Sequence, residues 1–146
     1  MRANPEENEE GSPIPKCSIE AQMCLDITTV EEKTYAVSNS VYDPYHSLCN
    51  LSGDSVSRTF INIYFDLVEI ERRKMMKAIV DLTDSQLVDA QYEIASKRAK
   101  AKTKKFKQEV DYGDKTKTLL KWNKYVYTEL GIDNAYLQGL TSKPLK

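Results

Sequence analysis

Glycine, proline and histidine are scarce in this sequence. Its 146 residues include five Gly, five Pro and one His, and residues 54–110 contain neither Gly nor Pro. Because Gly and Pro interrupt helices, their scarcity predicts a mainly α-helical protein with short connections. The sequence also lacks a Gly-rich phosphate loop, a Ser–His–Asp order and any other catalytic motif that we recognise. We therefore expect a non-enzymatic protein without a cofactor.

Long apolar runs and an even number of cysteines are also missing. No run approaches the roughly 20 apolar residues that span a membrane, and the N-terminus is acidic where a signal peptide would be apolar. Three Cys residues cannot form a complete disulfide framework, and few disulfides are typical of reducing compartments. The sequence therefore predicts an intracellular protein, cytoplasmic or nuclear, that stays out of membranes.

The three cysteines and the single histidine together form a possible set of zinc ligands, namely Cys17, Cys24, His46 and Cys49. Two residues separate His46 from Cys49, which is a suitable spacing. Six residues separate Cys17 from Cys24, which is longer than structural zinc sites usually have. We therefore expect no metal site, and the sequence does not tell whether the four side chains meet.

The longest helical signal runs through residues 54–110. Apolar residues recur at helical spacing in its first half, at Ile61, Phe65, Val68, Met75, Ile79 and Leu82. A second series follows, formed by Val88, Tyr92, Ala95, Ala99, Lys102 and Phe106. The two series are out of phase by one residue near 83–87, so a turn there is the simplest explanation. We predict a helical hairpin of about 55–82 and 84–110, with Thr83 as a cap, and keep one bent helix as the alternative.

The rest of the chain is divided by composition. We expect one helical domain that makes a small bundle, built on the helical hairpin with coiled-coil packing. Its expected parts are a disordered acidic tail at 1–16, a lead-in at 17–53, the hairpin at 54–110, a last helix at 115–130 and a loose C-terminal tail at 132–146. The domain itself would span 17–131.

The lead-in is ambiguous between helix and strand. Residues 18–28 match both periods, because Met23, Leu25 and Ile27 alternate as a strand does, while other pairs lie at helical spacing. Residues 29–42 favour a helix, since Thr29 and Glu32 match a capping box. A hairpin of strands through 29–37 is the alternative, supported by the β-branched residues there.

The helix predicted at 55–82 has a broad apolar face. Five residues widen it beyond what one neighbouring helix would cover, and they are Phe60, Ile63, Tyr64, Leu67 and Ile70. Large apolar faces of this kind bind partners. We therefore expect a helical interaction or assembly protein, a small subunit of a larger complex, that uses these five residues to contact a protein partner or a second copy.

The second half of the hairpin is strongly basic, and this supports an alternative function. Residues 97–107 contain seven Lys or Arg, which are Lys97, Arg98, Lys100, Lys102, Lys104, Lys105 and Lys107. All except Lys102 are candidates for binding nucleic acid or another polyanion, unless they simply form a solvated helix end. Lys102 lies on the apolar series, so we expect residues 97–107 either to project beyond the core or to pack against an acidic residue of a partner.

Four aromatic residues that follow are a further candidate, namely Tyr112, Trp122, Tyr125 and Tyr127. We expect them to form core, with base stacking as the alternative.

Overall fold

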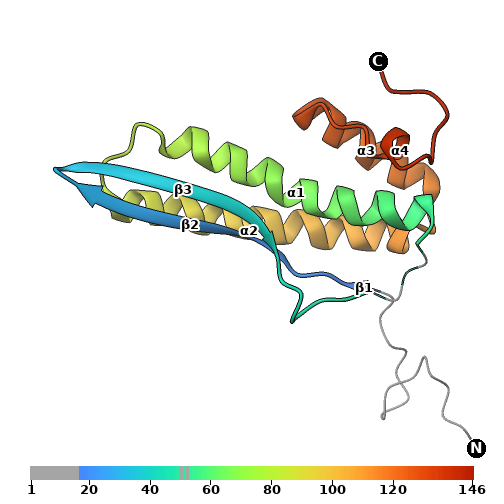
Figure 1. Cartoon of the computed structure of the whole chain (residues 1–146), viewed down its shortest axis with the longest axis horizontal. Coiled ribbons are helices and arrows are strands. Elements are labelled where there is room, and N and C mark those ends of the chain that lie inside the picture. Colours follow the sequence, from blue (N-terminus) through green and yellow to red (C-terminus); the bar gives the residue numbers. More distant parts are fainter. Residues whose placement is uncertain (1–16, 50, 52) are drawn as a thin grey trace, which may run out of the picture.

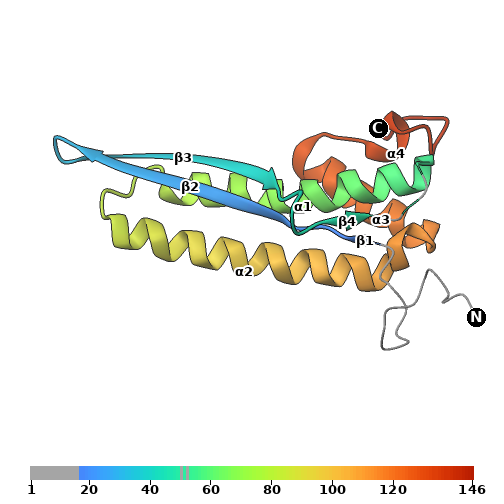
Figure 2. The ribbon, with the colours of Figure 1, turned by 60° about the horizontal axis from the view of Figure 1, so that its bottom comes forward.

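The computed structural model describes residues 17–49, 51 and 53–146 and is mainly α-helical, as the composition predicts. Two long helices, α1 (Ser55–Ile79) and α2 (Ser85–Val110), lie side by side along the molecule (Figures 1 and 2). Shorter elements follow: a 3-10 turn η1 (Asp111–Gly113), α3 (Thr116–Leu130) and α4 (Asn134–Leu137). The expected disordered tail at 1–16 lies outside the described residues.

Carboxylates cap both long helices. The side chain of Asp54 accepts a hydrogen bond from the backbone N–H of Ser57 at 2.8 Å, and that of Asp84 accepts one from Gln86 at 2.8 Å. These bonds satisfy amide groups that the first turn of a helix leaves unpaired. The cap of α2 is therefore Asp84, one residue later than the expected Thr83, and the chain leaves the helix at 80–84, where the apolar series changes phase.

A layer of β-structure covers one side of the two long helices, and this corrects the helix that we predicted at 29–42. Strands β2 (Ala21–Val30) and β3 (Lys33–Tyr42) form an antiparallel hairpin, and β1 (Cys17–Ser18) pairs with β4 (Leu48–Cys49). The inward side chains of β2, such as Met23 and Leu25, pack on the helices, while their neighbours face solvent. This alternation, together with the β-branched residues, favours strand over helix.

The register of the hairpin leaves its inward-facing residues without strand partners for their backbone groups. Val30 and Lys33 form the hydrogen-bonded pair that closes the two-residue turn, and hydrogen-bonded pairs then alternate with non-hydrogen-bonded ones along the hairpin. The hydrogen-bonded pairs are the residues that face solvent. The residues that face the helices therefore point their backbone N–H and C=O groups to the outer edges of the hairpin. Helix side chains meet two of these carbonyls. The hydroxyl of Tyr92 donates to Met23 O at 3.0 Å, and Arg72 donates to Ser38 O at 3.2 Å.

A cluster of charged and hydroxyl groups fastens β3 to α1, and we call Ser38, Ser40, Glu69 and Arg72 the clasp. Arg72 makes two hydrogen bonds of 2.7 Å to Glu69 and one of 2.9 Å to the Ser38 hydroxyl. The Ser40 hydroxyl donates to Glu69 at 2.8 Å. Hydrogen bonds from Arg72 lower the pKa of Glu69 to about 2, despite its partial burial.

Helix α1 is the centre of the core, since α2, α3, α4 and the β-hairpin of β2 and β3 all contact it. Phe60 is fully buried and stacks on Phe106 of α2 with ring centroids 5.0 Å apart. Phe65, which the sequence places on the main apolar series, is only half-buried. In the second half of α1 the buried residues are those of the predicted apolar series, such as Val68 and Met75. In the first half the buried face is rotated around the helix, away from that series.

The C-terminal segment differs from the loose tail that we expected at 132–146. Residues Asn134 and Ala135 of α4 are buried. The amide of Asn134 donates to Asp66 of α1 at 2.7 Å, and the amide of Asn123 in α3 donates to Asp133 at 2.8 Å. Burial raises the pKa of Asp66, although the bond from Asn134 opposes this. Packing therefore continues beyond residue 131.

Within the described residues, none of the helices combines the length and apolar character that a bilayer crossing requires.

Candidate binding surface

The five residues that we expected to bind a partner lie inside the chain. Their exposed fractions are 5% or less, and they are Phe60, Ile63, Tyr64, Leu67 and Ile70. The apolar face of α1 is wider than one packed helix can cover, and α2, α3 and the β-strands of the same chain together cover it. A partner could reach these side chains only if the fold opened, so in this structure they offer no docking face.

The basic residues of α2 divide between different sides of the helix. Arg98 and Lys105 border a hollow between α2 and α3, as does Lys102. Lys107 instead lies over the ring of Tyr64, 5.4 Å from its centroid. The remaining three, Lys97, Lys100 and Lys104, are exposed.

The α2–α3 hollow has a volume of about 620 Å³. That size is within the range of small-ligand sites. Its apolar lining comes from Ala101 on α2 and from the aromatic rings of Trp122 and Tyr125 on α3. The rings of Trp122 and Tyr125 meet edge to face with centroids 6.0 Å apart. Helices α2 and α3 therefore hold an aromatic surface that is partly open to solvent.

Lys102 is half-buried at the edge of this hollow and pairs with an acidic residue of its own chain, where we expected one from a partner. Its ammonium donates to Glu71 of α1 at 2.6 Å and to the hydroxyl of Tyr125 at 2.7 Å. Desolvation opposes its charge, but these two bonds outweigh it and raise the pKa of Lys102. The expectation that this half of α2 projects beyond the core is wrong, because Ala99 and Phe106 are buried on either side of Lys102.

The acidic side chains of the hollow are already paired, whereas two of its cations are not. Glu71 is paired with Lys102, and Glu109 accepts from Trp122 Nε1 at 2.9 Å and lies 3.7 Å from Lys105 Nζ. In the part of the chain that the structure describes, Arg98 and Lys121 have no ion-pair partner. Two cations are therefore available to an incoming anion beside an aromatic surface.

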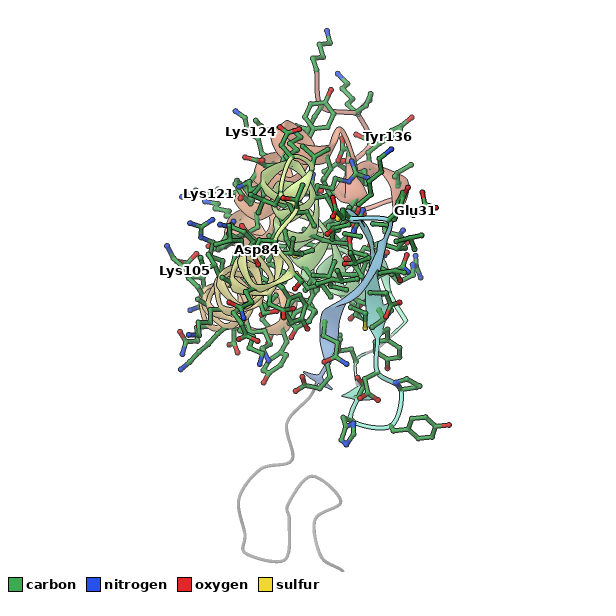
Figure 3. All side chains as sticks on the ribbon, turned by 90° about the vertical axis from the view of Figure 1, so that its left-hand side faces the viewer. Glu31, Asp84, Lys105, Lys121, Lys124 and Tyr136 are labelled. Carbon is green, nitrogen blue, oxygen red and sulfur yellow. The ribbon has the colours of Figure 1, made fainter. Side chains whose placement is uncertain are left out.

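Helix α3 extends the basic surface beyond α2. Figure 3 shows Lys105, Lys121 and Lys124 reaching out from the same side of the molecule. Residues 97–124 contain eleven Lys or Arg and three Asp or Glu. The sequence analysis found the α2 cations but missed Lys121 and Lys124, whose spacing is that of one helix face. It also missed Glu71, because nothing local shows that it meets Lys102.

The four possible zinc ligands are distributed along the first third of the chain. Cys24 lies exposed on the outer face of β2. His46 Nδ1 lies 2.6 Å from Asp43, and this bond raises the pKa of the imidazole. The register of β1 and β4 places Cys17 opposite Cys49. Among the described residues no group of three or more His, Cys, Asp or Glu is arranged to hold a metal.

No protein-family model, curated protein or solved structure matches this chain.

Proposed function

We propose that this protein is a non-enzymatic interaction protein that binds an acidic, partly apolar protein segment in the α2–α3 hollow. The packed helices α1 and α2 are its scaffold, and α3 completes the site. The observation that carries the proposal is the aromatic lining of Trp122 and Tyr125 next to the two unpaired cations, Arg98 and Lys121. An apolar groove between helices with a charged rim is a common way to bind an amphipathic segment.

An acidic protein segment suits the hollow better than a nucleic acid does. Stacking of bases needs free aromatic faces, but Tyr125 already has Lys102 over its ring at 5.0 Å. The ring of Trp122 makes edge-to-face contacts with Phe106 and Tyr125, with centroids 5.4 and 6.0 Å apart. A continuous phosphate backbone would also place charge against the apolar lining of Ala101, Trp122 and Tyr125, where it has no partner. A segment with a few carboxylates among apolar side chains avoids both problems.

Nucleic acid remains the second candidate, on a different surface. Lys97, Lys100 and Lys104 are exposed on α2 and make no ion pair with a described residue. They could neutralise phosphates without using the hollow.

Fluorescence of Trp122 tests the proposal directly, because this is the only Trp of the chain and it lines the hollow. The probes are a short peptide of alternating Glu and Leu, its Gln-for-Glu analogue and a single-stranded oligonucleotide. We expect the acidic peptide to shift Trp122 emission in a saturable way. Its neutral analogue should bind at least about tenfold more weakly.

Matched variants locate the binding. The double variant Arg98→Gln with Lys121→Gln should bind the acidic peptide much more weakly. The double variant Lys97→Gln with Lys104→Gln removes the same charge elsewhere on α2 and should bind the peptide as wild type does. The absence of a saturable response to the peptide would reject the hollow as a binding site. Tight oligonucleotide binding that only the second pair of changes abolishes would favour the nucleic-acid function.

A further inference from the structure

Charge is polarised along the long axis of the molecule. The hairpin tip and the α1–α2 connection lie at one end, and the C-terminal half of α2 lies at the other (Figures 1 and 2). Residues 26–34 and 81–93 contain seven Asp or Glu but only one basic residue, Lys33. Lys77, in the last turn of α1, is a further cation at this end. The opposite end holds the basic surface of residues 97–124.

The acidic end has a protruding tip. In Figures 1 and 2 the hairpin reaches past the ends of both long helices, with Glu31 and Glu32 at its turn. Both residues have left-handed backbone angles, with φ of 50° and 64°. Apolar side chains flank them, since Val30 is 52% exposed and Tyr35 is 56% exposed. The tip therefore presents two carboxylates close to exposed apolar side chains.

We propose that the tip of one copy, residues 30–35, docks in the α2–α3 hollow of a second copy, so that chains associate head to tail. This rests on the proposed function, because it names the acidic segment that the hollow binds. Glu31 and Glu32 supply carboxylates for Arg98 and Lys121, and Val30 or Tyr35 covers the aromatic lining. The charge complementarity of the two ends of this chain identifies a second copy as the occupant.

The contact joins two different surfaces, so it does not close on itself in a dimer. Such heterologous contacts give rings or open chains of subunits. Docking by charge at an open surface is screened by salt within about 10 Å at 0.1 M. Association should therefore grow with concentration at low ionic strength and fall steeply as salt is added.

The test uses two variants of the full chain that each lose one surface. The tip variant carries Glu31→Asn and Glu32→Gly, which removes both carboxylates but favours the same two-residue turn. The hollow variant carries Arg98→Glu and Lys121→Glu on exposed positions. Sedimentation velocity at low salt should show wild-type assemblies larger than a dimer, while each variant alone remains a monomer.

Mixing the two variants gives the decisive measurement. The tip variant keeps an intact hollow and the hollow variant keeps an intact tip, so one contact can form between them. We expect a species of two chains and nothing larger. Lys97→Glu with Lys104→Glu, the matched charge change outside the hollow, should assemble as wild type does. Circular dichroism and the Trp122 emission of each variant show whether it is folded.

Several results would overturn the inference. A wild-type chain that stays monomeric at low salt and high concentration rejects it, as does assembly by either variant alone. If the chain is monomeric but the Glu–Leu peptide still saturates the hollow, the occupant is another protein and the proposed function survives. If neither contact forms, both proposals fail.

Discussion

Three consecutive residues between α2 and α3 have left-handed backbone conformations. They are Asp111, Tyr112 and Gly113, with φ of 46°, 56° and 96°. This reversal lets the ring of Tyr112 pack on Phe60 with centroids 5.9 Å apart. It also brings Gly113 so close to α1 that a Cβ there would lie 2.9 Å from Val56 Cγ1. The orientation of α3, and hence the α2–α3 hollow, depends on this turn.

Gly113→Ala should destabilise the protein more than Gly131→Ala does. Both glycines have positive φ, which costs an alanine about 1 kcal/mol, but a Cβ at Gly131 would meet nothing within 4 Å. The contact with Val56 at Gly113 should add about 1–3 kcal/mol. Urea unfolding of the two variants measures the difference, and equal losses would show that the turn can relax away from α1.

Replacing Glu31 with Asn and Glu32 with Gly should stabilise the hairpin. Positive φ at both turn positions suits Asn-Gly and disfavours Glu, so the free energy of unfolding should rise by about 1 kcal/mol. Glu31→Gln with Glu32→Gln is the control, because it removes the charges and keeps the unfavourable backbone. A gain in the control alone would mean that charge repulsion, and not backbone conformation, limits the wild-type turn.

At the level of elements, the hairpin is attached to the helices in two ways. Strand β2 packs apolar side chains such as Met23 against α1 and α2. Strand β3 directs small side chains inward and is held by the clasp of Ser38, Ser40, Glu69 and Arg72. Apolar packing does not depend on pH, whereas the clasp requires ionised Glu69. The two strands should therefore respond differently to acid.

Acid should loosen β3 before the helices unfold. The pKa of Glu69 falls from 4.5 to about 2 on folding, so its ionisation stabilises the fold above pH 4.5. That contribution, up to about 3 kcal/mol, is lost as pH falls from 4.5 towards 2. Hydrogen exchange should show earlier loss of protection in 33–42 than in 55–79. Glu69→Gln should remove this acid dependence, and a variant that keeps it would exclude the clasp as its source.

On the scale of the whole molecule, one helix connects all the other elements. Helix α1 meets α2, the hairpin, α3 and α4, and its polar side chains also have internal partners. Asp66 binds Asn134, Glu69 holds β3 and Glu71 holds Lys102. A monomer therefore uses both the apolar and the acidic side chains of α1 in internal contacts.

Deleting residues 132–146 should destabilise the protein by several kcal/mol, because it removes buried Ala135 and leaves Asp66 without Asn134. Deleting 1–16 should leave stability unchanged, since that segment has little to bury. Thermal unfolding of both truncated chains compares them. A large loss from the N-terminal deletion would show that the acidic tail contributes to the fold.

The amount of structure that sequence determines differs between segments. The spacing of Val68, Met75 and Ile79 is enough to predict the second half of α1, because a long helix repeats its signal many times. Residues 29–42 carry too few repeats, so the Thr29–Glu32 spacing suggested a helix cap where the structure has a turn. The lysines of α2 are visible in sequence, but which of them face the hollow depends on where α3 lies.

The sequence by itself determined a mainly α protein with a long apolar face and a basic α2, since composition and periodicity are local properties. Only the tertiary structure decided what covers that face. Helices α2 and α3 and the β-strands bury Phe60, Ile63 and Leu67, and Lys102 meets Glu71 across 31 positions. Such contacts follow from how elements pack on one another, and no local pattern encodes them.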